Sequence, residues 1–80
     1  MWQEKDQKLY RDFKFKDFRE AFEFMGKVAA MADQMNHHPK WTNEYNRVEI
    51  WLSTHSAGDK ITDQDHQLAA KIDKIYGGIK

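Results

Sequence analysis

The alternation of apolar and polar residues predicts that the chain opens with a β-hairpin. Over residues 2–15, the segments "WQEK" and "KLYRDFKF" flank a polar turn near Asp6 and Gln7. In the second segment the side chains alternate with a period of two, which gives a strand one apolar face and one wet face. The first face holds Leu9, Arg11, Phe13 and Phe15, and the second holds Tyr10, Asp12 and Lys14.

A helix is predicted next, from Asp17 to residues 35–36. The segment "DFRE" is a capping box, in which Asp17 accepts from the backbone N–H of Glu20 and Glu20 reaches back. Pro39 disfavours helix at His38. The apolar residues recur at helical spacing. They are Phe18, Ala21, Phe22, Met25, Ala29 and Ala32, with Val28 beside them.

A second hairpin is predicted from "KWTNEY" and "RVEIWLSTH", with a turn near Asn46. Alternation again separates two faces of the second strand. One face holds Val48, Ile50 and Leu52, and the other holds Glu49, Trp51, Ser53 and His55. On a regular strand, His55 therefore lies on the face opposite the core.

The last helix is predicted to follow the loop "SAGDKIT". Thr62 is a favourable N-cap, and Asp63 and Asp65 place negative charge in the first turn, where the helix dipole favours it. The apolar stripe is Leu68, Ala69, Ile72 and Ile75. Gly77 and Gly78 predict a helix end near Tyr76.

These elements in the order ββαββα predict an α+β fold, a four-stranded antiparallel sheet with two helices packed on one face. Residues 1–80 are too few for more than one domain. Thirteen basic residues balance thirteen acidic ones, which argues against nucleic acid as a partner. No apolar run approaches the roughly 20 residues that span a membrane, and no apolar leader is visible. We therefore expect a cytoplasmic protein.

The candidate chemistry lies between residues 35 and 58, in "MNHHPKWTNEYNRVEIWLSTHSAG". His37 and His38 follow the end of a predicted helix, His55 lies at the end of a predicted strand, and Asp65 lies in the first turn of the last helix. If the second hairpin pairs tightly, its outer ends lie together, so "HHP" comes beside "STH". The order of the elements thus predicts that these four residues meet.

Three interpretations of this cluster stay open on the residues alone. The histidines are solvated loop residues, or zinc ligands, or proton-transfer groups. Three histidines and an aspartate match a zinc ligand set, but the side chains of adjacent histidines diverge, and no HxH, HxxxH or HExxH spacing occurs. Imidazole exchanges protons near neutrality, and without cysteine the chain offers no thiolate nucleophile. His66 is predicted to be a surface residue, and Trp41 to cover part of the pocket or core.

The residues also resemble a known family. "NHHPKWTNEYNRVEIWLSTHSAG" followed by "DQDHQLAAKID" strongly resembles the pterin-4a-carbinolamine dehydratases, and the resemblance extends upstream through "FKFKDFREAFEFMGKVAAMAD". It covers nearly the whole chain. The combination of HHPxW, YNxVxIxLSTH and D-x-x-LA is highly specific, whereas HHP alone is not.

The resemblance implies a dehydratase that converts 4a-hydroxy-tetrahydropterin to quinonoid dihydropterin, with neither a cofactor nor a metal. It implies His37, His38 and His55 as site histidines and Asp65 as their supporting acid. We expect His37 and His55 to share the proton transfers and His38 to orient the pterin. The expected substrate-binding residues are Asn36, His37, His38, Pro39, Trp41, Ser53, Thr54, His55 and Ser56.

The chain departs from the family pattern at several points. Many members carry a helix before the first strand. The loop "SAGDKIT" is one residue longer than the usual turn, which makes Asp63 the alternative to Asp65. Asn36 stands where an acidic residue is common.

Two further expectations concern partners. The resemblance implies a homodimer or homotetramer, with which an outward-facing Trp51 agrees. The alternative to an enzyme is a non-catalytic interaction or dimerisation module on the same scaffold, since a fold does not guarantee a function.

Overall fold

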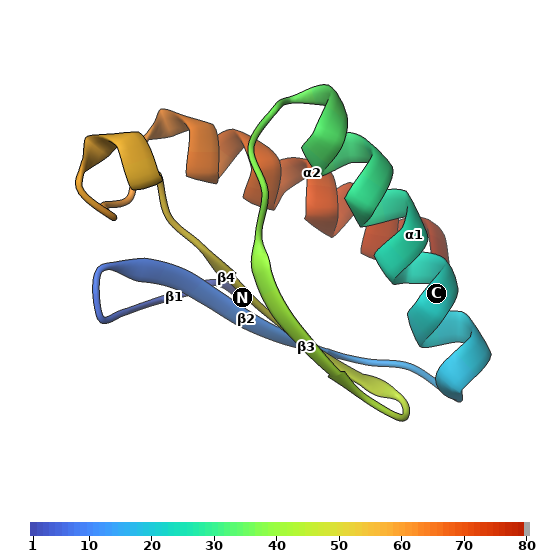
Figure 1. Ribbon diagram of the computed structural model, residues 1–80. Coiled ribbons are helices and arrows are strands. Elements are labelled where there is room, and N and C mark those ends of the chain that lie inside the picture. Colours follow the sequence, from blue (N-terminus) through green and yellow to red (C-terminus); the bar gives the residue numbers. More distant parts are fainter. Residues whose placement is uncertain (80) are drawn as a thin grey trace.

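The computed structural model describes residues 1–79 and confirms the predicted α+β fold. Its elements are β1 (Gln3–Lys5), β2 (Lys8–Lys14), α1 (Phe18–Gln34), β3 (Lys40–Glu44), β4 (Arg47–Leu52), the short 3-10 helix η1 (His55–Ala57) and α2 (Asp63–Ile79). The strands form one antiparallel sheet in the order β1-β2-β4-β3. Both helices lie on the same side of this sheet (Figure 1).

The first hairpin turns at Asp6 and Gln7, as predicted. Both residues have positive φ, 52° and 63°, and they join the pair Lys5 and Lys8. A two-residue turn with two left-handed residues matches the right-handed twist of the strands that it connects. The turn therefore sets the register by which Leu9 of β2 reaches the core.

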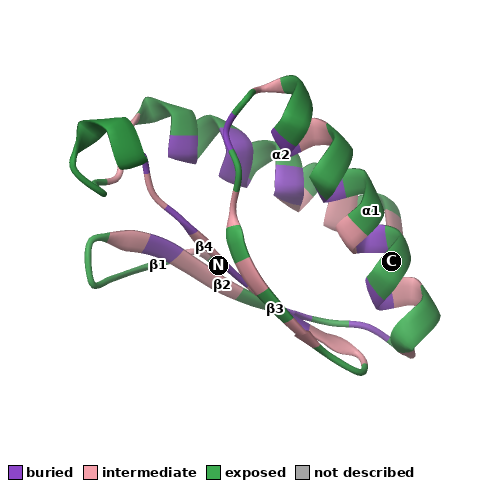
Figure 2. Ribbon diagram, in the orientation of Figure 1, coloured by how far each residue is buried: buried purple, intermediate pink, exposed green. Residues whose placement is uncertain are grey.

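The core lies between the sheet and the two helices, and the buried segments of the helices face the strands (Figure 2). The two central strands β2 and β4 supply much of it, with Phe13 opposite Val48 and Leu9 opposite Leu52. The buried apolar residues are Leu9, Phe13, Phe15, Ala21, Phe24, Val28, Ala32, Val48, Ile50, Leu52, Leu68, Ala69 and Ile72. Within residues 1–79, no helix is long and apolar enough to cross a bilayer.

The apolar stripe of α1 was predicted only in part. Ala21, Val28 and Ala32 are buried as expected, but the large side chain between them is Phe24, which is fully buried. Phe18 and Phe22 are 48% and 62% exposed, and their rings stack at 5.9 Å. Both sets of positions have helical spacing, so spacing alone cannot choose the one that faces the sheet.

The end of α1 near residues 35–36 is confirmed, whereas the predicted end of α2 near Tyr76 is wrong. The helix α2 continues through Gly77 and Gly78 to Ile79. Tyr76 packs edge-on against Phe13, and Ile79 also lies against the core. These contacts offset the poor helix propensity of the two glycines, which is about 1 kcal/mol each.

The strand β4 is shorter than predicted. It ends at Leu52, and Thr54 then pairs with Lys60 in an isolated bridge. His55 starts η1 and does not continue the strand. The alternation of side chains cannot reveal that the strand ends at Leu52, because the backbone partner of Thr54 is Lys60, which lies in a loop.

The outer face of the sheet carries a polar network centred on Glu49. Its carboxylate accepts from the hydroxyls of Tyr10 (2.7 Å) and Thr42 (3.2 Å) and from Nη2 of Arg47 (3.3 Å). The hydrogen bond from Tyr10 is the main cause that lowers the pKa of Glu49, and it raises the pKa of Tyr10. Trp51 tilts against the Tyr10 ring at 5.3 Å, so residues of the same chain partly cover it.

Candidate active site

The first site segment begins where α1 ends. Asn36 has φ 53°, in the left-handed region, which asparagine tolerates better than most residues. The N–H of His37 donates to the carbonyl oxygen of Ala32 (3.0 Å), and that of Asn36 donates to Asp33 (3.1 Å). These two bonds make a Schellman motif. The end of the helix therefore fixes the point at which His37 leaves it.

The second site segment is the exit of β4. The N–H of Thr54 donates to the carbonyl oxygen of Lys60 at 2.8 Å, which closes the loop that contains η1. The chain turns back at Gly58, whose φ of 81° suits a residue without Cβ. This loop places His55 at the first position of η1, where its side chain is 97% exposed.

The third site segment is the first turn of α2, which supplies a fully buried carboxylate. Asp65 is 0% exposed. Its Oδ2 accepts from the backbone N–H of Thr62 (2.9 Å) and from the hydroxyl of Thr54 (2.8 Å). Its Oδ1 lies 2.5 Å from Nε2 of His37. Asp63, the alternative acid suggested by the sequence, is exposed and is not among the residues that line the hollow of the three histidines.

The contact with Asp65 determines which ring nitrogen of His37 carries the hydrogen. An ionised carboxylate only accepts hydrogen bonds, so Nε2 of His37 carries the hydrogen. The remaining nitrogen, Nδ1, is then the one that can accept a proton. His37 is 8% exposed, so this orientation is held inside the protein.

The other two site histidines each lie beside an aspartate of their own. Nδ1 of His55 is 3.0 Å from Oδ1 of Asp59, and Nε2 of His38 is 3.5 Å from Oδ1 of Asp33. Both pairs are exposed, so water screens them far more than the buried pair of His37. Neither Asp33 nor Asp59 was expected at the site from the sequence. In the sequence, the only sign of them is their spacing: Asp33 lies five residues before His38, and Asp59 lies four residues after His55.

The three histidines line one surface hollow of about 510 Å³. Its lining residues are Asn36, His37, His38, Ser53, Thr54, His55, Ser56 and Gln64. The hollow thus lies where the ends of α1 and β4, the start of η1 and the first turn of α2 meet. Gln64 is a polar lining residue that was not expected from the sequence, in which only its place beside Asp65 points to it.

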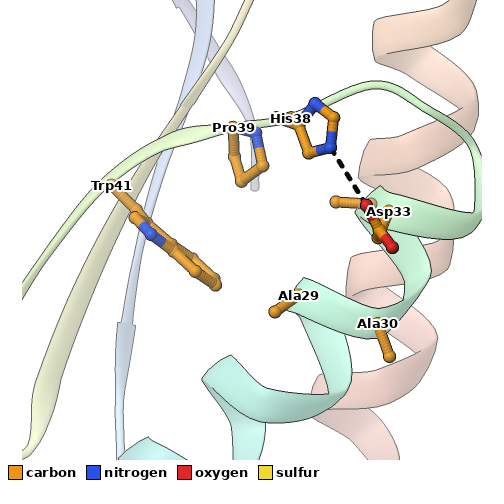
Figure 3. Close-up of a pocket in the computed structure, with 7 residues that line it drawn as sticks. Ala29, Ala30, Asp33, His38, Pro39 and Trp41 are labelled. Carbon is orange, nitrogen blue, oxygen red and sulfur yellow. Dashed lines mark hydrogen bonds and ion pairs between the residues drawn. The ribbon is translucent and has the colours of Figure 1, made fainter.

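Pro39 and Trp41 lie around a neighbouring hollow, on the other side of His38. Figure 3 shows Trp41 facing Ala29 across this space, with His38 and Asp33 at its rim. His38 lines both hollows. The structure therefore separates the predicted contacts Pro39 and Trp41 from the cluster of His37 and His55.

The imidazole and carboxylate groups of the site are suited to proton transfer. Among residues 1–79, no three histidine or acidic side chains group in a way that could hold a metal ion. His66 is exposed on α2, as expected of a surface residue. The cluster instead offers one imidazole held by a buried carboxylate and two imidazoles at the surface of the same hollow. Such groups can give and accept protons near neutrality.

Comparison with known proteins gives consistent matches. A family described as pterin 4 alpha carbinolamine dehydratase matches residues 1–75. A relative from Solibacter usitatus, provisionally named a pterin-4-alpha-carbinolamine dehydratase, is 52% identical over 77 residues, which cover 96% of this chain and 80% of the relative. A relative from Paraburkholderia xenovorans with the same provisional name is 55% identical, over 84% of this chain and 69% of its own length.

Solved structures agree with the fold. The crystal structure of a transcriptional coactivator/pterin dehydratase from Brucella melitensis has a TM-score of 0.89 and 44% identity, and the match covers 94% of this chain and 81% of that one. A pterin dehydratase-like protein, identified as a RuBisCO assembly factor in the alpha-carboxysome, has a TM-score of 0.79. Its identity is 22%, with coverage of 96% and 88%, so this likeness concerns the fold alone.

Proposed function

Because the chain belongs to the pterin 4 alpha carbinolamine dehydratase family, we propose that it removes water from 4a-hydroxy-tetrahydropterin to give quinonoid dihydropterin, a recycling step for a pterin cofactor. One observation carries the proposal. Three histidines line a single hollow, and a fully buried carboxylate holds one of them.

The reaction needs two proton transfers in opposite directions. A proton reaches the 4a-hydroxyl, the C4a–O bond breaks with its electron pair, and water leaves. The proton on N5 is taken away, and the electron pair of the N5–H bond becomes the second bond between N5 and C4a. One acid and one base therefore suffice, and the number of protons on the enzyme is the same before and after.

We assign the base to His37 and the acid to His55. With its Nε2–H bound to Asp65, His37 can receive the N5 proton at Nδ1, and the carboxylate stabilises the imidazolium that forms. His55 contacts Asp59 through Nδ1, which leaves Nε2 to donate toward the leaving hydroxyl. His38, between the two hollows, is assigned to hold and orient the pterin.

The neighbouring polar groups are assigned to substrate binding. Asn36, Ser53, Ser56 and Gln64 share the hollow with the histidines and can hydrogen-bond the pterin ring. Thr54 also lines it. Pro39 and Trp41 flank the site beyond His38.

The test is the dehydration of freshly generated 4a-hydroxy-tetrahydropterin, followed by ultraviolet absorbance. The parent protein should accelerate the reaction, and His37→Ala and His55→Ala should each lower kcat by roughly 10²- to 10⁴-fold, the usual contribution of an acid or base. His66→Ala is the matched control, since His66 is exposed on α2 and lies outside the hollow. It should retain the parent rate.

The same dehydration assay can also contradict the proposal. If folded parent protein gives no acceleration above the spontaneous rate, the dehydratase proposal fails. A non-catalytic interaction module on the same scaffold then becomes the working hypothesis.

We further propose that the chain acts as a homodimer or homotetramer. Phe18 and Phe22 expose apolar surface on α1, and β1 and β3 are the two edge strands of the sheet. Exposed apolar patches and open strand edges are the surfaces through which small chains associate.

A further inference from the structure

Outside the histidine-lined hollow, a threonine hydroxyl is linked to the site by a chain of hydrogen bonds. Oγ1 of Thr62 lies 2.6 Å from Oγ1 of Thr54, and the hydroxyl of Thr54 is 2.8 Å from Oδ2 of Asp65. Asp65 in turn contacts His37 through its other oxygen. Thr62 is therefore three contacts away from the imidazole to which we assign the base.

The direction of each hydrogen bond follows from the chemistry of the groups. The carboxylate of Asp65 only accepts, so the single hydroxyl hydrogen of Thr54 points at Asp65. Thr54 must then accept from Thr62, whose hydroxyl is the donor of the pair. The order of donation is Thr62 to Thr54, Thr54 to Asp65, and His37 to Asp65.

This use of the Thr62 side chain differs from ordinary helix capping. A threonine before a helix usually accepts from a backbone N–H of the first turn. Here the hydroxyl of Thr62 instead spans the gap between α2 and the exit of β4, where it meets Thr54. Its backbone N–H separately donates to Oδ2 of Asp65 (2.9 Å). Two donors thus converge on Oδ2, which leaves Oδ1 to His37.

We propose that Thr62 is a positioning residue for the dehydration, acting through Thr54 and Asp65 on the orientation of His37. The inference rests on the proposed function. Without the hydroxyl of Thr62, that of Thr54 loses the donor that orients it and can rotate away from Asp65. The carboxylate of Asp65 then loses a fixed partner at Oδ2, so it can rotate. The imidazole ring of His37, which is bound to Oδ1, is then held less firmly in one orientation.

The experiment compares Thr62→Val and Thr62→Ala, which lack the hydroxyl, with Thr62→Ser, which keeps it. Thr42→Val is the matched control, because Thr42 donates its hydroxyl to Glu49 on the outer face of the sheet. Two quantities are measured: kcat and KM for dehydration, and the proton resonance of the His37 Nε2–H group. Burial and the bond to Asp65 should protect this proton from exchange.

The expected result is a fall in kcat of roughly tenfold in Thr62→Val and Thr62→Ala, with KM within about twofold of the parent. The His37 resonance should shift or broaden in both. Thr62→Ser should restore the rate and the resonance, and Thr42→Val should change neither. A fall in kcat at nearly constant KM, together with a changed His37 resonance, is not produced by a general loss of stability. Thr62→Ala also keeps the test open if valine, which puts a methyl group where the hydroxyl met Thr54, prevents folding.

Two outcomes would overturn the inference. One is a Thr62→Val or Thr62→Ala protein that is less stable but keeps the parent kcat and the parent His37 resonance. The other is loss of kcat that Thr62→Ser fails to restore. If the parent itself has no activity, the proposed function fails, and the His37 resonance alone then decides whether Thr62 positions the imidazole.

Discussion

At the scale of single residues, Asp65 connects helix formation with the chemistry of the site. Its side chain accepts from the N–H of Thr62, as an acidic residue in the first helical turn does in a capping box. The same carboxylate accepts from His37 across the molecule. The residue therefore stabilises the start of α2 and orients the candidate base at the same time.

Asp65→Asn should lower both stability and activity. The amide has one acceptor oxygen where the carboxylate has two, so one buried donor from Thr54, Thr62 or His37 loses its partner. The expected cost is about 1–3 kcal/mol in the free energy of unfolding, measured by urea denaturation, with a fall in kcat of roughly tenfold or more. Asp63→Asn, in the same turn but exposed, should stay within about 0.5 kcal/mol of the parent. Equal effects of the two substitutions would contradict the role of Asp65.

Asn36 has a conformational role that its position in the sequence does not reveal. Its left-handed backbone ends α1 and directs His37 inward. Asn36→Gly should keep the stability of the parent within a few tenths of a kcal/mol, whereas Asn36→Ala should lose about 1 kcal/mol, because a Cβ is unfavourable at positive φ. Thermal unfolding checks both values. The activity of the stable glycine variant then shows separately whether the amide binds substrate. An alanine variant as stable as the glycine variant would exclude the conformational role.

At the scale of secondary-structure elements, the sequence predicted the type and order of the strands and helices because their periodicities are clear. It could not choose between two stripes of α1 that both have helical spacing, and Phe24 rather than Phe22 enters the core. It also predicted that the last helix ends near Tyr76, whereas α2 runs to Ile79 because tertiary contacts of Tyr76 and Ile79 keep the chain helical. In both cases, tertiary packing determines the outcome, namely which face of α1 is buried and where α2 ends, and the local pattern of residues does not contain that information.

The outer face of the sheet gives a prediction about pH. Because hydrogen bonding lowers the pKa of Glu49 on folding, its contribution is present above the unfolded pKa of about 4.3 and is lost as pH falls through the lower folded value. Tyr10→Phe should therefore destabilise the protein at pH 7, by about 0.5 kcal/mol for a solvent-screened pair, and by less in acid. Tyr10 has a raised pKa, so its contribution is present below about pH 10 and is lost as pH rises through the raised value.

Urea unfolding at pH 7 and at roughly pH 3.5, below the unfolded pKa of glutamate, measures this difference. Tyr45→Phe provides the control, since Tyr45 lies exposed in the turn between β3 and β4. An equal loss for Tyr10→Phe at both pH values would show that the hydrogen bond to ionised Glu49 is not the source of the stability.

At the scale of the whole molecule, the site draws on three segments: the end of α1, the exit of β4 with η1, and the first turn of α2. The sequence predicted their meeting, because the pairing of β3 and β4 brings the end of α1 close to the exit of β4. It could not predict the aspartate beside each surface histidine. The position of Asp59 depends on the turn at Gly58 and that of Asp33 on the way α1 ends, and neither geometry has a periodic pattern.

The exposed aromatic pair on α1 leads to a prediction about assembly. Phe22→Ser should weaken self-association, raising the dissociation constant by roughly tenfold or more, because buried aromatic side chains dominate interface energies. Light scattering coupled to gel filtration at several concentrations measures it. Glu23→Ser is the control, an exposed position on the same helix. If both variants keep the parent mass at every concentration, association uses another surface, such as the edges at β1 and β3.

The bond between His37 and Asp65 also has a consequence for the order of events in folding. It joins residues 28 positions apart in the chain, so closing it costs loop entropy that local contacts must already have offset. The pair can form only when the end of α1, which carries His37, and the first turn of α2, which carries Asp65, are both in place. In a stopped-flow refolding experiment, catalytic competence should therefore recover no earlier than the helical signal. For the same reason, we expect a nascent chain to stay inactive until α2 has been made and has packed against the rest of the domain.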